Sequence, residues 1–258
     1  THAIGSVSTF GGIDLDDIIA DAGVLDNQGD PYTHVAAYGF FIDGDAVGLT
    51  GLFPDVFGDP QNGKPAPFCS QCDFFKWGAT GAVVEFSNGP NSTQYVDTVG
   101  LGWWVAGDIP TVGQLPTLGS ASYAGHTIGT VLQRVSTEGL PQWQSHIGAG
   151  NVELSWNFQA RSGEFDIRNF NAPSSNIGPL NATGTLRLPD DLASTARNRF
   201  NGPISGTVGQ IGDVSGGAFG SFARRGTDAT AGVIGNWQAG NGSNYRATGI
   251  FGASRIGQ

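Results

Sequence analysis

The sequence predicts an all-β protein whose C-terminal part is a closed antiparallel barrel. Glycine occupies 42 of the 258 positions, a density that supplies many turns with positive φ and suits short strands joined by hairpins. Only 13% of the residues are charged, and no long stretch alternates Glu and Lys as an exposed helix would. From about Leu101 onward, short runs rich in Val, Ile, Thr and aromatic residues recur between Gly, Pro and Asn. Helix is therefore expected to be a minor component.

Residues 1–98 are expected to form a smaller and less regular β-rich region that packs on the barrel. The helix candidate is Gly12–Asp21, where an aspartate can cap the first turn. Val35–Ile42 is a strand candidate, and Asp43-Gly44-Asp45 is a turn signal that ends it.

Residues 99–258 are expected to form an eight-stranded antiparallel barrel. Every second residue from Val152 to Phe158 is apolar, and Phe165 and Ile167 repeat this alternation after a short Arg161-Ser162-Gly163 turn. A series of such hairpins loses its exposed edges by closing on itself. The strand candidates are 102–106, 120–123, 127–133, 146–158, 164–170, 182–188, 199–208, 218–223, 231–238 and 245–252. They outnumber eight, so some are expected to merge or to lie outside the barrel.

The charge balance excludes one class of partner. A net charge of −10 opposes a phosphate backbone, so nucleic acid is not an expected partner.

No apolar run reaches the roughly 20 residues of a membrane helix, and the absence of Met favours a processed, exported chain. We therefore expect an extracellular protein or one on the outer surface of a bacterial cell.

Four motifs carry a family resemblance: Ser122–Gly129, Trp156–Gly163, Gly216–Gly220 and Tyr245–Gly252. In this order they resemble strand pairs of the transferrin-binding-protein-like β-barrel domain of bacterial surface proteins, and the resemblance covers roughly residue 100 to the C-terminus. It implies a barrel filled by its own side chains, with partner contacts made by loops. It implies no enzymatic activity. These motifs are structural, so they do not identify the partner.

The Cys69-Ser70-Gln71-Cys72 segment is the first candidate for chemistry, since this spacing serves thiol exchange, metal ligation or a small disulfide loop. Thiol exchange needs a helix N-terminus, whereas the surrounding prolines and aromatic residues indicate a loop that enters a strand. A zinc site needs about four ligands, and no second pair completes the set. In an exported protein, a disulfide between Cys69 and Cys72 is the expected state.

Bound metals and cofactors have little support in the sequence. The calcium candidates are Asp26, Asp30, Asp43 and Asp45, but the spacing does not match an EF-hand loop and solvated turns are the simpler explanation. His126 and the other histidines are scattered, and Cys72 is followed by Asp73, so a haem attachment motif is absent. We expect no cofactor.

Catalysis is not expected either. The sequence has no nucleophile elbow, no zinc-protease motif and no phosphate-binding loop. Glu153, Glu164 and Asp166 fall at the solvent-facing positions of the predicted hairpin. The protein is therefore expected not to be an enzyme.

Aromatic residues that precede the barrel are the candidates for contact with a partner: Phe74, Phe75, Trp103 and Trp104, with Phe68 and Trp77 nearby. Adjacent tryptophans cannot both face inward on one strand, so one must meet another layer. That layer is either the N-terminal region packed on the barrel, which is the simpler explanation, or a neighbouring subunit or ligand.

These features favour a non-catalytic surface or secreted protein that binds another protein, a cell surface or a small solute through the barrel loops. The alternative is a structural subunit of an extracellular filament, coat or matrix, assembled by donation of a strand such as Thr1–Phe10 to a neighbouring copy. The partners expected are therefore a protein or surface, or copies of the chain itself.

Overall fold

A computed structural model describes residues 2–6, 34–43, 68–69, 72–87, 95–137 and 140–257. The predicted helix Gly12–Asp21 and the calcium candidates Asp26, Asp30 and Asp45 lie outside these residues. Asp43 is the last residue of strand β2 (His34–Asp43), which contains the predicted strand Val35–Ile42. In the part of the chain described, no helix is long and apolar enough to cross a membrane.

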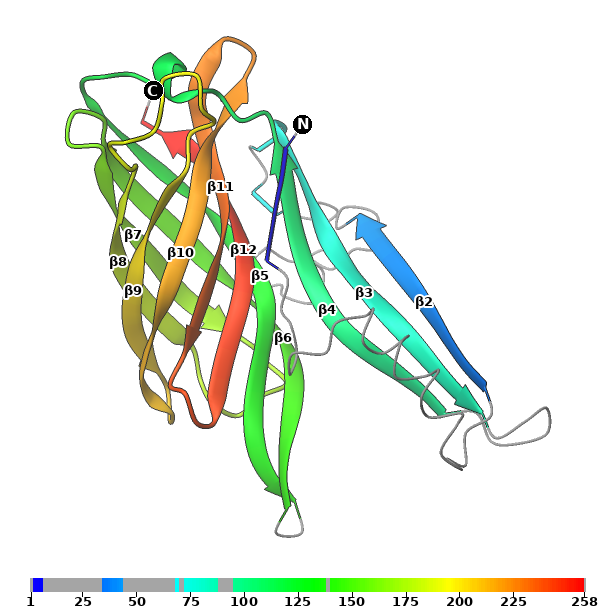
Figure 1. The fold of residues 1–258 in the computed structure, drawn as a ribbon. Coiled ribbons are helices and arrows are strands. Elements are labelled where there is room, and N and C mark those ends of the chain that lie inside the picture. The colour runs from blue at the N-terminus through cyan, green and yellow to red at the C-terminus, as the bar shows by residue number, and fades with distance from the viewer. Residues whose placement is uncertain are drawn as a thin grey trace, which may run out of the picture.

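The C-terminal part is a closed barrel of eight strands, each antiparallel to both neighbours, which confirms the predicted fold (Figure 1). The strands are β5 (Ser120–Thr137), β6 (Leu140–Asn157), β7 (Ser162–Asn171), β8 (Leu180–Arg187), β9 (Phe200–Val208), β10 (Gly212–Arg225), β11 (Asp228–Gly240) and β12 (Tyr245–Ile256). The barrel closes where β12 pairs with β5. Every strand of the barrel therefore pairs with two neighbours.

The predicted strands 120–123 and 127–133 are a single strand in the structure. Residues Ala124, Gly125 and His126 were expected to turn, but they continue β5, and His126 is paired with Asn151 on one side and Gly252 on the other. Small residues in the middle of a strand also occur where two backbones approach closely. A Cβ at Gly125 would lie 2.1 Å from the carbonyl oxygen of Gly252, so glycine is needed here for strand pairing rather than for a turn.

The barrel interior is filled by side chains from the alternating strands. Val152, Leu154, Trp156 and Phe158 are all buried, as the alternation predicts. The Trp156 ring lies 5.2 Å from the ring of Phe222, and at the other end Phe170 packs edge-on against Trp237 at 4.8 Å.

A chain of buried hydrogen bonds joins three neighbouring strands, β11, β5 and β12, in the same interior. The indole N–H of Trp237 donates to Thr127 Oγ1 at 2.7 Å, and the Thr127 hydroxyl donates to the carbonyl oxygen of Ile250 at 2.8 Å. The polar groups of this chain are therefore satisfied within the core.

The N-terminal residues form a four-stranded antiparallel sheet in the order β1-β4-β3-β2, where β1 is His2–Ser6, β3 is Phe75–Ser87 and β4 is Tyr95–Gly107. The predicted strand 102–106 belongs to β4, so it lies in this sheet and not in the barrel. The division of the chain into domains at 98/99 stays a prediction.

The sheet leans on the outside of the barrel, where β1 and β4 contact β11 and β12 (Figure 1). The sheet and the barrel share a hydrophobic core. It contains Trp77, Trp103 and Val105 from the sheet and Ile128, Ile234 and Ile250 from the barrel. The Trp103 indole donates to Thr130 Oγ1 at 2.8 Å across this interface. The expected packing of the N-terminal region on the barrel is confirmed.

One end of the barrel is covered by two connecting segments. The segment after β4 includes a short 3₁₀ helix, η3 (Val112–Gln114), and its backbone pairs with the β8–β9 connection through Val112 N–H to Ala196 O at 2.8 Å. Asn198, which is fully buried, ties these segments to β10: its side chain donates to Pro110 O at 2.8 Å and accepts from Phe222 N–H at 2.7 Å.

Candidate functional site

The aromatic residues that precede the barrel mostly serve the interface between the sheet and the barrel. Phe75 and Trp103 are buried there, as are Phe68 and Trp77, so these four side chains do not offer an exposed aromatic surface. The simpler of the two explanations from the sequence holds, because Trp103 meets the outer face of the barrel. Phe74 and Trp104 are half-buried, and their contact with a partner stays a prediction.

Cys69 and Cys72 form the expected disulfide, which lies in the same interface. The Cys69 N–H donates to Nδ1 of His126 on β5 at 2.9 Å, so the disulfide loop is joined directly to the barrel wall. Burial lowers the pKa of His126 below its usual value, and a neutral imidazole is also the form that can accept this hydrogen bond at Nδ1.

We expect the attachment of the disulfide loop to weaken in acid. Because the pKa of His126 is lower in the folded than in the unfolded protein, its contribution to stability is complete above about pH 6.5 and is lost as the pH falls from there through the folded pKa. The protection factor of the Cys69 amide, which corrects for the intrinsic slowing of exchange in acid, should therefore fall as the pH is lowered from about 7 to about 5. His126→Gln keeps an acceptor without titrating, so an unchanged acid effect in that variant would contradict this assignment.

The β5–β6 hairpin projects beyond the rest of the barrel (Figure 1). β12 pairs with β5 only as far as Gln133, and β7 pairs with β6 only from Ala149 onward. Beyond these points the described residues of the hairpin have strand partners only in each other, although Arg134 and His146 still form hydrogen bonds with Asn244 and Ser174. A two-stranded ribbon has little stability of its own. The projecting part of the hairpin therefore lacks the support of a third strand.

An aromatic and cationic cluster lies at the base of this hairpin. The Trp143 side chain is 44% exposed, and the guanidinium carbon of Arg246 on β12 lies 5.2 Å from its ring centroid. Arg134 is the cross-strand partner of Trp143, and its N–H donates to Asn244 O at 2.8 Å. We call Trp143, Arg134 and Arg246 the hairpin cluster.

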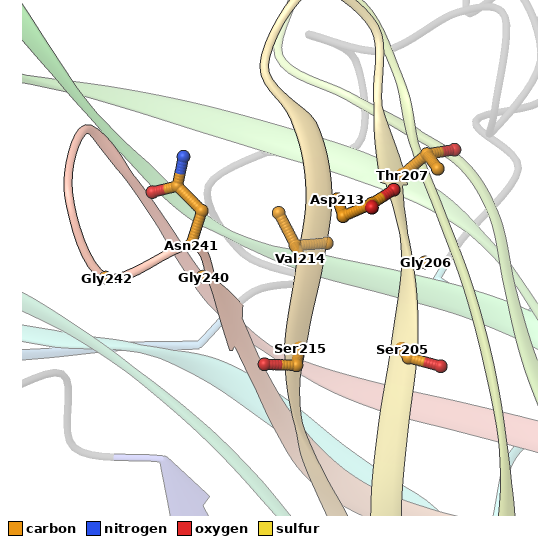
Figure 2. Close-up of a pocket in the computed structure, with 9 residues that line it drawn as sticks. All are labelled: Ser205, Gly206, Thr207, Asp213, Val214, Ser215, Gly240, Asn241 and Gly242. Carbon is orange, nitrogen blue, oxygen red and sulfur yellow. The ribbon is translucent and has the colours of Figure 1, made fainter.

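A second candidate is a hollow of about 820 Å³ on the outside of β9 and β10. Figure 2 shows that hydroxyl side chains from both strands line it, together with the start of the β11–β12 turn. The lining residues are Ser205, Gly206, Thr207, Asp213, Val214, Ser215, Gly240, Asn241 and Gly242. No basic residue is among them.

Neither hollow nor hairpin carries a recognisable catalytic arrangement. Within the described ranges no group of three or more His, Cys, Asp or Glu side chains is close enough to hold a metal ion. Glu153 and Asp166 instead share an ion pair with Arg168, at 3.0 Å and 3.3 Å, on the outer surface of the barrel.

The fold defines a closed eight-stranded β-barrel whose core is filled by its own side chains. No family model matches the chain, and no curated protein sequence matches it. The comparison with solved structures does find similar chains.

Transferrin binding protein B from Haemophilus parasuis is similar over 74% of this chain and 34% of its own, with 13% identity and a TM-score of 0.46. The isotype 1 protein from Neisseria meningitidis is similar over 73% of this chain and 32% of its own, with 14% identity and a TM-score of 0.45. HpuA from Kingella denitrificans, in complex with human haemoglobin, is similar over 73% of this chain and 57% of its own, with 16% identity and a TM-score of 0.34.

This chain therefore spans about a third of the length of the transferrin binding proteins that it matches. The resemblance carried by the sequence motifs recurs in the comparison of structures. At these identities and scores, no residue role is transferred from them.

The hairpin cluster and the hollow were both missed by sequence reasoning. Trp143 precedes the predicted strand 146–158, so it fell in an assumed loop. Phe219, which is on the same strand as the hollow's residue Ser215, belongs to the motif Gly216–Gly220, whose resemblance is structural. The alternation along β10, with Ala218 and Phe222 buried and Phe219 exposed, is the signal that could have found it.

Proposed function

We propose that this protein is a non-catalytic β-barrel protein of the bacterial cell surface or exterior that binds a protein partner through the projecting β5–β6 hairpin. The hairpin cluster carries this proposal. Trp and Arg are enriched among the residues that dominate binding energy at protein interfaces, and here one exposed Trp is flanked by two Arg on a chain whose net charge is −10. A local positive patch of this kind favours an acidic surface on the partner.

The filled interior supports recognition from outside the barrel. Phe165 packs against Phe251 at 4.9 Å and Phe170 against Trp237 at 4.8 Å between the barrel walls. These packed aromatic side chains fill the space inside the barrel that a solute would need. The names of the similar proteins supply the first probes, transferrin and human haemoglobin.

A photo-crosslinking residue placed at position 143 is expected to trap a protein partner on intact cells of the source organism that have been incubated with these two probes. Leu118, which is 68% exposed near the covered end of the barrel, is the matched control position. Crosslinked protein should be recovered from position 143 and not from 118. Binding of the trapped partner should then weaken about tenfold or more in Trp143→Ala, as for an interface hot spot. Equal trapping from both positions, or none from either, would contradict the proposal.

The alternative of a filament subunit depends on Thr1–Phe10. Its described part, His2–Ser6, pairs with β4 of the same chain as the edge strand β1. An edge strand that short could be exchanged between copies. Native mass spectrometry of the purified chain separates the two functions, since ordered homopolymers that vanish on deletion of residues 1–12 would favour assembly.

A further inference from the structure

The outer face of β9 and β10 has an unusual composition. Its outward positions, all described by the structure, are Asn201, Pro203, Ser205 and Thr207 on β9 and Asp213, Ser215, Gly217 and Phe219 on β10. Asp213 is the one charged side chain among these eight. By contrast, the outer face of β6 and β7 carries the ion pairs of Arg168 with Glu153 and Asp166. We call the β9–β10 face the neutral face.

An aromatic ring lies on this face with its surface open to solvent. Phe219 is 51% exposed. A polar residue at this outward position of β10 would cost the barrel core nothing. A Cβ at Gly217 would lie 3.6 Å from Cε2 of Phe219, so the ring leans along β10 over the glycine. Gly217 is in turn paired with Pro203 on β9 and Gln238 on β11. The ring therefore lies over a residue without a side chain, along the surface of the barrel, and does not project from it.

The hollow of Figure 2 lies further along the same strand, where Ser215 of β10 is four residues, or about 13 Å, from Phe219. β10 pairs with β11 as far as Ser215 and Gly240, and the chain then turns away. Asn241 holds this turn, since its Oδ1 accepts the N–H groups of Ser243, Asn244 and Tyr245, each at 3.1 Å. These hydrogen bonds fix the conformation of the β11–β12 turn, which forms one wall of the hollow.

We propose that the neutral face is a binding site for an uncharged oligosaccharide. A sugar ring has an apolar C–H face and a rim of hydroxyl groups. The aromatic ring of Phe219 can stack on the apolar C–H face of a sugar. The hydroxyls of Ser205, Thr207 and Ser215 both donate and accept hydrogen bonds, as sugar hydroxyls do, and Gln238 adds an exposed amide. From Phe219 to Asp213 the strand extends for about 20 Å, enough for several linked sugar rings.

Other occupants fit less well. A peptide that adds a strand needs a free edge, and the closed barrel gives every strand two neighbours. An anionic ligand would meet Asp213 and a net charge of −10 without a basic side chain in the hollow. This site is separate from the hairpin cluster, so its test is independent of the proposed protein partner.

The experiment is an array of immobilised oligosaccharides, some neutral and some sialylated or sulfated, probed with the full chain. Calorimetric titration with the strongest neutral binder follows. Phe219→Ala is expected to weaken that binding about five- to tenfold, the loss that corresponds to one aromatic stacking contact. Phe219→Trp should retain or strengthen it. Leu118→Ala, at the covered end of the barrel, should leave it unchanged.

A second variant guards against an effect of Phe219→Ala on folding. Ser215→Lys keeps the ring and places a long side chain in the hollow, so it should also lose binding, and thermal unfolding of both variants should match the parent protein. The proposal is overturned if no neutral oligosaccharide binds, if sialylated or sulfated ones bind better than their neutral counterparts, or if the folded Phe219→Ala variant binds as the parent does.

Discussion

Replacing Phe222 with alanine is expected to lower the free energy of unfolding by about 3–5 kcal/mol. The Phe222 side chain is fully buried. Its ring lies within 5.2 to 5.9 Å of the rings of Trp156, Phe200, Phe158 and Tyr123. These rings come from β5, β6, β9 and the β6–β7 turn, so none can collapse into the cavity without moving a strand of the closed barrel. A loss of that size is a large share of the stability of an ordinary domain.

Urea unfolding followed by tryptophan fluorescence measures this effect, because Trp156 contacts Phe222 directly. Phe219→Ala is the matched control: it is the same substitution three positions earlier on β10, but at a side chain that is 51% exposed. The control should change stability by no more than about 0.5 kcal/mol. Similar losses at both positions would mean that β10 does not present alternate residues to the core and to solvent.

Asn198→Ala is expected to cost about 2–4 kcal/mol and to loosen the covered end of the barrel. The substitution removes the acceptor of the Phe222 N–H at 2.7 Å and the donor to the carbonyl oxygens of Pro110 at 2.8 Å and Phe222 at 3.3 Å. These groups are buried, and a buried polar group that loses its partner cannot regain water without opening the structure. The connection from β4 to β5 should therefore detach first.

Hydrogen exchange separates this local loosening from global unfolding. In Asn198→Ala, the amides of Val112 and Gly113, which donate to Ala196 and Ser194, should lose more protection than amides in the middle of β6. Asn201→Ala changes the same residue type at an exposed position on β9 and should leave both regions unchanged. Equal loss of protection in β6 and at Val112 would show that Asn198 stabilises the barrel as a whole.

The candidate sites lay largely beyond what the sequence could predict. The disulfide was predicted because two cysteines three positions apart leave few alternatives in an exported chain, and the structure has it. The hairpin cluster was not, since Trp143 and Arg246 are distant in sequence and meet only because β12 pairs with β5. The neutral face likewise depends on which strands are neighbours in the closed barrel.

The sequence by itself determined the fold class, the barrel and the inward side of β6 and β7, because alternation with a period of two is a local property of an extended chain. Val152 to Phe158 show this directly. Only the tertiary structure decided that residues 102–106 join the N-terminal sheet and that 120–133 are one strand. It also decided that Trp103 is covered while Trp143 is exposed. Each of these outcomes depends on contacts between segments far apart in the chain, and no local pattern encodes which surfaces will meet.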